Sequence, residues 1–391
     1  MKIRREDTMT YLSSDNRSLM ICIVYILVMT GWVTGTASAQ PSASLIRAYY
    51  VKKMPPDYKK QEQFIASLKD TGANTVILEL PMNEQEMPEL VNVHNAVYLA
   101  HQAGMKIHIV LPTRKLAGIL SQHSDWEDNQ YDLGQGTVTS TGKLDLFNKA
   151  VVEYLTSLAK EIASYSVDGL LLGPDFHYSP VEGIGTAASE HAVTDLKWAP
   201  DPRLLFKKVR RGSEGPIIEE YGEYYGRWTS FKRDRLLYVF DQIRKAGRSA
   251  NAGLKIGVPI PLVVPVSTDD RIFNQFAYDM NAFRKLNCDY YWTAIDYRDI
   301  KRKQNLTYRQ TMEQLSRRAY SAITTVKSPD QVILALQAIT ETGAMIPMFE
   351  MEEISVLVKN AGETGIAYII GPEATISRTF MKKIFYGTVK P

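Results

Sequence analysis

The sequence predicts an α/β protein folded as a single (β/α)8 TIM barrel, and three observations support this fold class. Eight short apolar runs alternate with amphipathic stretches of helical length from residue 45 onward. Most units repeat one order: a helix, a glycine near its end, an apolar run, and then a proline or polar residue. Eight such units suit one closed barrel. An open doubly wound sheet is the alternative, but no Gly-rich phosphate loop follows the first run.

Four apolar runs in the first half predict parallel strands that are buried on both faces, because they are short and uniformly apolar. The third run is halted by Pro112 and the fourth by Gly173 and Pro174, since proline has no N–H for the next ladder hydrogen bond. We expect helices that end near Gly72 and that cover residues 89–103 and 144–164. The predicted strands cover residues 45–51, 74–80, 106–111 and 167–172.

The second half of the chain repeats the same alternation and supplies the remaining four strands. Its predicted strands cover residues 254–260, 289–295, 331–338 and 366–370. Its predicted helices cover residues 229–246, 272–286, 308–325 and 349–361, and a short helix ends the chain. A regular alternation of this kind predicts one domain rather than two.

Two long polar segments interrupt the alternation, residues 121–142 after the third strand and residues 177–226 after the fourth. The second has little periodicity and holds a basic run at 207–211 and an acidic, aromatic cluster at 219–228. A long structureless connection is unusual inside a domain. Insertions are common, however, in the loops that carry the active site of a barrel. We therefore expect long loops on the active face.

Residues 1–39 are predicted to be a secretory signal peptide, and residues 40–391 the barrel. An apolar run at 19–33 precedes a pattern of small residues that predicts cleavage before Gln40, with an uncleaved membrane anchor as the alternative. Cleavage would leave Cys288 as the one thiol, so we expect no internal disulfide. The expected location is periplasmic or extracellular, and association with the outer membrane stays open.

Composition and motifs narrow the classes of partner and cofactor. The 391 residues are 45% hydrophobic and 23% charged, which is typical of a globular protein. The net charge of +3 is too near neutral to indicate nucleic acid or an anionic membrane as the main partner. The six histidines are not spaced as a metal-binding set, and no serine-hydrolase, zinc-protease or Walker motif occurs. We expect no metal and no cofactor.

Several carboxylates follow predicted strands, where the strand ends of a barrel would gather them around one pocket. Glycoside hydrolysis needs a carboxylic acid that protonates the leaving oxygen and, in most families, a second carboxylate. Asp175 is the first candidate for the acid, and Glu79 and Asp296 are candidates for its partner. Capping of the following loop is an equally good interpretation of Asp175. Glu79 and Asp296 could equally be positioning or capping residues.

Other polar and aromatic residues near strand ends are candidates for substrate binding, because aromatic faces stack on sugar rings. Acidic neighbours around Trp126 and Trp228 would suit a cationic amino-sugar through ion pairing and cation–π contact. Core packing is the alternative for Trp292. The predicted substrate-binding residues are Tyr50, Arg114, Trp126, His177, Tyr178, Trp228, Trp292 and Glu373.

The chain resembles the C-terminal hydrolase-like domain of the bacterial poly-β-1,6-N-acetylglucosamine N-deacetylases of biofilm export. The resemblance is carried by Val167-Asp-Gly-Leu-Leu-Leu-Gly-Pro-Asp175 and by four further segments in the same order, at residues 75–79, 106–112, 274–294 and 334–347. It implies a TIM barrel that binds, and in some members cleaves, partly de-N-acetylated poly-glucosamine. It also implies that Asp175 stands at the position of the catalytic aspartate of the family.

Four departures from the family pattern bear on activity. Gly173 and Pro174 replace a His-Asp pair, Ala335 replaces an acidic residue, and the last strand ends in a different sequence up to Glu373. The Asp-rich first strand of the family is also absent around Tyr49. The metal-dependent deacetylase domain is missing, so deacetylation is not expected. Two hypotheses result: an exported glycoside hydrolase-like protein acting on an amino-sugar polysaccharide, or a non-catalytic polysaccharide-binding barrel that assists export. Either hypothesis implies a poly-glucosamine partner and contact with envelope or export machinery.

Overall fold

The computed structural model describes residues 45–198, 201–212, 215–261, 276–326, 328–340, 344–372, 374 and 377–386. The predicted signal peptide at 1–39 and its cleavage site lie outside these residues, as does Glu373. No helix among the described residues is both long enough and apolar enough to cross a membrane.

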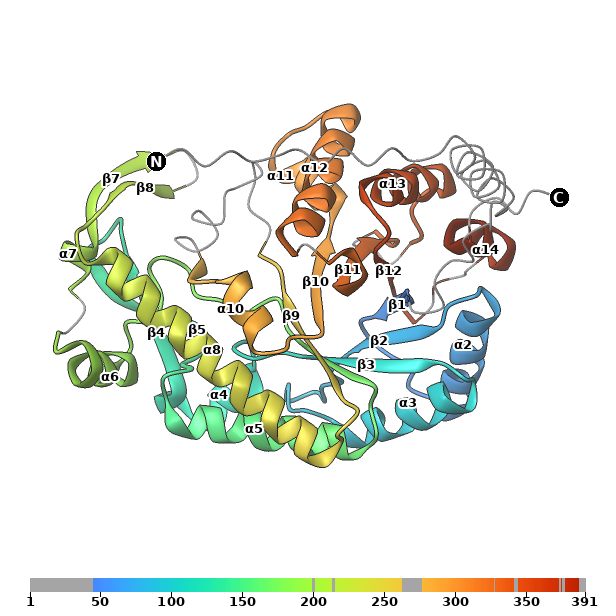
Figure 1. The fold of residues 1–391 in the computed structure, drawn as a ribbon, viewed down its shortest axis with the longest axis horizontal. Helices are drawn as coiled ribbons and strands as arrows, with labels where there is room; N and C mark the ends of the chain where they lie inside the picture. The colour runs from blue at the N-terminus through green and yellow to red at the C-terminus, as the bar shows by residue number, and fades with distance from the viewer. Residues whose placement is uncertain are drawn as a thin grey trace, which may run out of the picture. The chain divides into compact units, whose positions relative to one another are not determined.

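Eight parallel strands close into a barrel in the order β1-β12-β11-β10-β9-β6-β3-β2, with helices between them (Figure 1). The predicted TIM barrel is therefore confirmed, and each strand lies within two residues of its predicted bounds. Apolar runs bounded by glycine and proline located the strands well because a parallel strand is covered on both faces. The strands are β1 (Arg47–Val51), β2 (Thr75–Glu79), β3 (Lys106–Leu111), β6 (Gly169–Leu172), β9 (Lys255–Pro259), β10 (Tyr290–Ile295), β11 (Val332–Gln337) and β12 (Gly365–Ile370).

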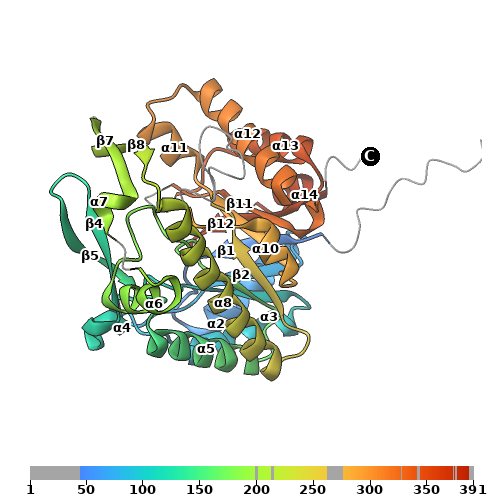
Figure 2. The same cartoon turned by 60° about the vertical axis from the view of Figure 1, so that its left-hand side comes forward.

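Helices surround the barrel (Figure 2). Polar side chains cap several of them. The Asp57 carboxylate accepts the N–H of Lys60, and the Asn148 side chain accepts the N–H of Ala150. The main helices are α2 (Tyr58–Asp70), α3 (Leu90–Gln102), α5 (Lys149–Ser164), α8 (Tyr225–Ala250), α12 (Tyr308–Val326), α13 (Met348–Ala361) and α14 (Arg378–Tyr386). Shorter helices are α4 (Ala117–Gln122), α6 (Thr186–Leu196), α7 (Pro202–Leu205), α10 (Met280–Lys285) and α11 (Tyr297–Lys303).

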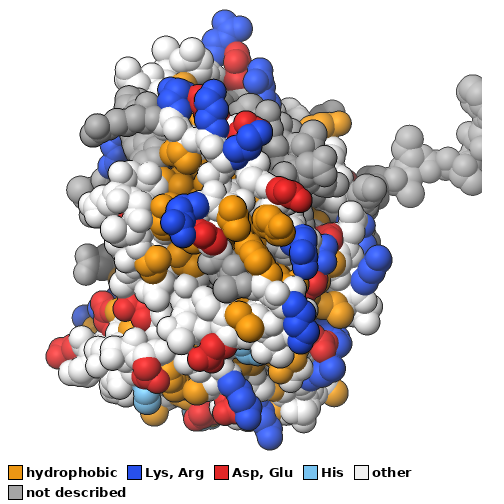
Figure 3. All heavy atoms as spheres, turned by 90° about the vertical axis from the view of Figure 1, so that its left-hand side faces the viewer, with side chains coloured by type: hydrophobic (Ala, Val, Ile, Leu, Met, Phe, Trp, Pro, Cys, Tyr) orange, Lys and Arg blue, Asp and Glu red, His pale blue; other side chains and the backbone are white. Residues whose placement is uncertain are grey.

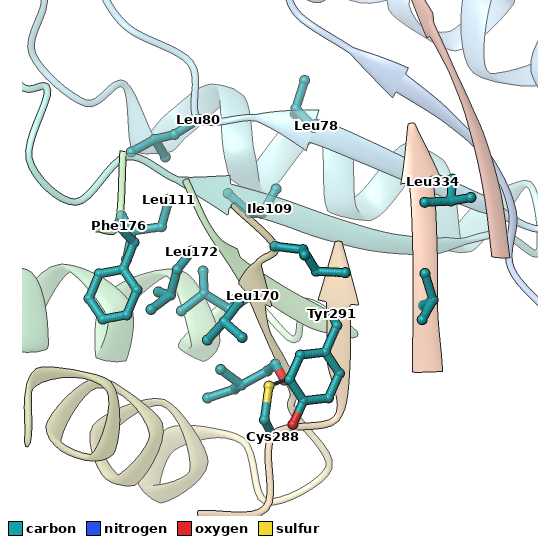
Figure 4. Packing of buried hydrophobic residues seen from close by; sticks show 14 of the residues in the cluster. Leu78, Leu80, Ile109, Leu111, Leu170, Leu172, Phe176, Cys288, Tyr291 and Leu334 are labelled. Atoms are coloured by element: carbon teal, nitrogen blue, oxygen red, sulfur yellow. Dashed lines mark hydrogen bonds between the residues drawn. The ribbon is translucent and has the colours of Figure 1, made fainter. Parts of the chain in front are cut away.

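The buried side chains form two layers because successive residues of a strand point to opposite faces. One layer fills the barrel interior and includes Tyr50, Leu171 and Trp292. The other lies between the strands and the helices, and Figure 4 shows part of it, with Leu170 and Leu172 of β6 beside neighbouring strands. Leu171 thus points inward while its two neighbours point outward. This alternation decides which strand-end residues can reach the mouth of the barrel.

Both predicted loops contain regular structure, which corrects the sequence-based expectation. Residues 121–142 hold a 3-10 turn at Ser124–Trp126 and most of an antiparallel hairpin of β4 (Glu127–Asp132) and β5 (Thr137–Leu144). Residues 177–226 hold α6, α7 and a second hairpin of β7 (Phe206–Gly212) and β8 (Gly215–Tyr221). Figure 3 shows the face that carries these insertions, where acidic and basic side chains are interspersed.

The basic run of the second insertion lies on β7 and is paired with acidic residues on β8. Lys208 lies 2.8 Å from Glu219, and Arg210 lies 2.6 Å from the same carboxylate. Lys207 forms an ion pair with Glu220. These cross-strand pairs are exposed, so they contribute little to stability. They neutralise much of the charge that could otherwise attract an anionic polymer.

Candidate active site

The carboxyl ends of the strands form the mouth of the barrel, and four predicted site residues meet there. Tyr50 lies on β1, Glu79 ends β2, Asp175 follows β6, and Trp292 lies on β10. The rings of Tyr50 and Trp292 stack with their centroids 5.9 Å apart. The Tyr50 hydroxyl and the Glu79 carboxylate share a hydrogen bond, and Asp175 is close enough to act electrostatically on both. The structure therefore brings two carboxylates and two aromatic rings together.

Asp175 is buried, with 6% of its surface exposed, and its two carboxylate oxygens have different surroundings. Oδ2 accepts three backbone N–H groups from the loop after β3: Thr113 at 3.0 Å, Arg114 at 2.5 Å and Lys115 at 2.7 Å. Oδ1 is buried and has no hydrogen-bond partner among the described residues. These contacts are those of a loop cap, and they leave the second oxygen buried without a partner among the described residues. The catalytic role of Asp175 stays a prediction.

Gly173 allows the free oxygen of Asp175 to occupy the mouth. This glycine continues the inward-facing positions of β6, after Gly169 and Leu171. A Cβ atom at Gly173 would lie less than 3.0 Å from Oδ1 of Asp175 and 3.0 Å from Cα of Pro112. No side chain fits in that space, so Oδ1 lies where an inward-pointing side chain would otherwise stand.

Glu79 is half-buried and surrounded by groups that affect its charge. Burial raises the pKa of Glu79, and the neighbouring charge of Asp175 raises it further. Lys52 and the hydrogen bond from Tyr50 oppose this rise. Burial, followed by the charges of Glu79 and Asp175, raises the pKa of the Tyr50 hydroxyl, which therefore stays protonated and donates. A carboxyl group in this environment can hold a proton closer to neutral pH than an exposed glutamate can.

Trp292 forms the inner wall below the mouth. Only 1% of its surface is exposed, and its indole Nε1 donates to the carbonyl oxygen of Leu172 at 2.8 Å. The next residue of β10 on the same face, Ala294, is exposed, so the barrel opens above this ring. Core packing, the alternative for Trp292, thus describes its contacts. Any contact between Trp292 and a ligand is limited to the edge of the ring.

The predicted ligand-binding role of Arg114 is contradicted, because its guanidinium is fully buried and its partners are other parts of the protein. It lies 2.6 Å from both Asp128 and Glu182 and donates to the carbonyl oxygen of His177 at 2.5 Å. Although burial alone would raise it, the charges of Arg114 and Lys143 lower the pKa of Glu182 to about 2. Arg114 therefore ties the β4-β5 hairpin and the segment after β6 to the barrel.

Tyr178 and Trp228 are also enclosed, which corrects their prediction as sugar-binding residues. The Tyr178 ring lies under the guanidinium of Arg114, 4.3 Å from its central carbon. Trp228 packs against Phe231, with ring centroids 5.3 Å apart. Beside them the ammonium of Lys232 donates to three backbone carbonyl groups, and burial lowers its pKa to about 7. Acidic neighbours in the sequence misled the prediction for Trp228, because its ring faces the core.

The remaining predicted residues lie away from the four at the mouth or at its edge. His177 shares the loop of Asp175, and its Nδ1 lies 2.9 Å from the carbonyl oxygen of Pro174. Burial and the charge of Arg114 lower the pKa of His177 to about 4, so it is neutral at neutral pH. Asp296 is exposed directly after β10. Trp126 lies on the insertion after β3 and stacks on His123, with the ring centroids 4.1 Å apart.

Three residues at the mouth were missed by the sequence-based prediction. Lys52 lies beyond the end of β1 and acts on Glu79 electrostatically. Gln337 ends β11 on the inward face, where its Oε1 accepts the N–H of Arg298 at 3.3 Å. Gly173 was interpreted as the end of a strand and as a departure from the family pattern, but not as a site residue. Alternate residues of a strand face the barrel interior, so counting every second residue from the inward apolar positions could have found Gln337 and Gly173. Among the described residues, no group of three or more potential ligands could hold a metal ion.

Comparisons of the sequence with protein-family models and with curated proteins gave no match. Solved structures match the fold. The PgaB (BpsB) glycoside hydrolase domain from Bordetella bronchiseptica has a TM-score of 0.62 and 15% identity, covering 83% of this chain and 93% of that one. The catalytic domain of β-amylase from Paenibacillus polymyxa has a TM-score of 0.57 and 12% identity, covering 88% and 98%. A β-galactosidase from Halorubrum lacusprofundi has a TM-score of 0.56 and 10% identity, covering 88% and 57%.

Proposed function

We propose that this protein is an exported glycoside hydrolase that acts on an amino-sugar polysaccharide such as partly de-N-acetylated poly-β-1,6-N-acetylglucosamine. The observation that carries the proposal is the meeting of Glu79 and Asp175 at the barrel mouth, beside Tyr50 and Trp292. In most families, hydrolysis of a glycosidic bond uses two carboxyl groups that flank the scissile bond, one of which donates a proton. Glu79 and Asp175 differ in their surroundings: Asp175 accepts three backbone N–H groups, whereas burial raises the pKa of Glu79.

The choice of an amino-sugar rests on charge and on the family resemblance. The charged groups around Glu79 are its own carboxylate, that of Asp175 and the ammonium group of Lys52. The two negative charges outnumber the one positive charge, so the mouth favours a cation such as the ammonium group of a glucosamine unit. The solved structures of similar fold include a PgaB glycoside hydrolase domain. Export to the periplasm or the cell exterior, and contact with envelope or export machinery, rest on the predicted signal peptide and on the resemblance.

A non-catalytic polysaccharide-binding barrel is the second candidate. The observation that favours it is the replacement of two acidic positions of the family, by Pro174 before Asp175 and by Ala335 on β11. Ala335 is completely buried in the barrel interior. In this case the mouth would hold the polymer without shortening it.

The two candidates are separated by incubating the protein with partly de-N-acetylated poly-glucosamine oligomers and following their length by mass spectrometry. We expect wild type to shorten the oligomers, and Glu79→Gln and Asp175→Asn each to slow this by about 10²–10⁴-fold. The control is Glu153→Gln, which makes the same change on the exposed side of α5 and should leave the rate unchanged. Oligomers that bind wild type but keep their length would instead establish the binding barrel.

A further inference from the structure

We propose that the two carboxyl groups have unequal roles: Glu79 donates the proton to the leaving oxygen, and Asp175 faces the anomeric carbon as the second carboxylate. This assignment rests on the proposed function and reverses the order expected from the sequence, in which Asp175 was the first candidate for the acid. It also makes Tyr50 a positioning residue for Glu79. The geometry around each carboxylate supports the assignment.

The surroundings of Asp175 suit a carboxylate and not an acid. Three N–H groups converge on Oδ2, and each of these hydrogen bonds is strengthened when the acceptor carries a negative charge. A proton on Oδ2 would displace at least one of them. Oδ1 has no donor among the described residues and lies over Gly173 at the mouth. The protein thus holds the charge through one oxygen and leaves the other to face a substrate.

The surroundings of Glu79 suit a group that gains and loses a proton. Among the described residues no backbone N–H group donates to its carboxyl group, and its neighbours at the mouth are the Tyr50 hydroxyl and the charges of Lys52 and Asp175. Asp175 and burial favour the protonated form, whereas Lys52 and Tyr50 favour the ionised form. The stacking of Tyr50 on Trp292 fixes the hydroxyl that orients Glu79. Glu79 therefore changes charge under the control of its three neighbours.

The step balances as follows. The bond between the anomeric carbon and the glycosidic oxygen breaks, its electron pair stays on that oxygen, and the oxygen takes the proton of Glu79 and leaves as an alcohol. Asp175 stabilises the positive charge that develops on the anomeric carbon. Water then adds to this carbon. Its proton goes to Asp175 if the configuration inverts, and to Glu79 if it is retained through a bond between the sugar and Asp175.

The assignment is tested with two glucosamine substrates, the natural oligomer and an aryl glycoside whose nitrophenolate leaves without a proton. We expect Glu79→Gln to lose about 10²–10⁴-fold on the oligomer but to stay within about tenfold of wild type on the aryl glycoside. Asp175→Asn should lose activity on both. If Asp175→Asn keeps the aryl activity and Glu79→Gln does not, the roles are the reverse of those proposed.

A second measurement needs no turnover and therefore separates this assignment from the proposed function. The carboxyl carbon of Glu79 is followed by NMR in protein labelled with 13C-glutamate, with Glu79→Gln to identify its signal. The pKa of Glu79 should be raised in wild type, lower in Asp175→Asn, and higher still in Tyr50→Phe, which loses the opposing hydrogen bond. An ordinary pKa that neither variant moves would overturn the assignment, even if wild type cleaves glycans. If the pKa of Glu79 behaves as expected in all three proteins but wild type cleaves neither substrate, only the proposed function is refuted.

Discussion

Replacement of Gly173 by alanine tests how the fold positions the free oxygen of Asp175. The added Cβ would lie less than 3.0 Å from Oδ1, 3.0 Å from Cα of Pro112 and 3.1 Å from the carbonyl oxygen of Leu111. Two of these neighbours are backbone atoms and cannot easily move, so the carboxylate must shift by roughly 1 Å to restore ordinary contact distances. That shift pulls Oδ2 away from the three N–H groups that donate to it and weakens these hydrogen bonds.

The cost can be worked from those contacts. Hydrogen bonds to charged groups contribute about 1.5–3 kcal/mol each, and losing one of the three should destabilise the fold by about 2–3 kcal/mol. A misplacement of about 1 Å at a reacting group should lower kcat/KM by about 10²-fold. Urea unfolding measures the first quantity, and oligomer cleavage at substrate concentrations far below KM measures the second.

Gly226→Ala is the matched control. Gly226 lies in the first turn of α8, and a Cβ there would meet nothing within 4 Å. This change should leave activity unaltered and raise stability by at most about 1 kcal/mol, because alanine favours a helix. If Gly173→Ala behaved like Gly226→Ala in both assays, Oδ1 of Asp175 would not occupy the position described, and its place at the mouth would be refuted.

Further predictions concern buried groups. Because the pKa of Glu79 is raised in the folded state, its protonated form stabilises the fold at acid pH, and this contribution is lost as pH rises through that pKa. The melting temperature of Glu79→Gln should therefore exceed that of wild type at neutral pH and equal it at acid pH. Glu182→Gln should cost about 3–5 kcal/mol at neutral pH, with the difference shrinking as pH falls from about 4.5 toward the pKa of about 2, because the charge paired with Arg114 is then lost in wild type too. Trp228→Phe should lower stability by about 1–3 kcal/mol and leave the rate of oligomer cleavage unchanged, whereas Trp292→Phe should lower that rate by about tenfold; equal cleavage rates in the two variants would contradict their different placement.

The strands were predictable because a parallel barrel buries them on both faces, which leaves uninterrupted apolar runs such as the one at Gly169–Leu172. The two hairpins could not be predicted, because they lie outside the barrel and their strands carry charged side chains in place of an apolar face. On β7, Lys208 and Arg210 have the alternation of a strand, but the alternating residues pair with Glu219 and do not pack on a core. A polar segment of this kind looks like a loop until its partner strand is known.

The site was predictable only in part. Position at the end of a strand placed Glu79 at the mouth, and position just after a strand placed Asp175 there, because all strands of the barrel end at the same face. The same rule failed for Arg114, whose side chain turns away to join Asp128 and Glu182. The partners of a strand-end residue come from insertions far along the chain, so sequence alone could not separate a ligand-binding side chain from a buried clamp.

The most direct test is a structure of the Glu79→Gln variant with a bound glucosamine oligomer. The oligomer should cross the barrel mouth with one glycosidic oxygen within about 2.6–3.2 Å of the Gln amide at position 79 and the adjacent anomeric carbon facing Oδ1 of Asp175. An oligomer bound on another face, or one whose glycosidic oxygen lies next to Asp175 and away from position 79, would contradict the account.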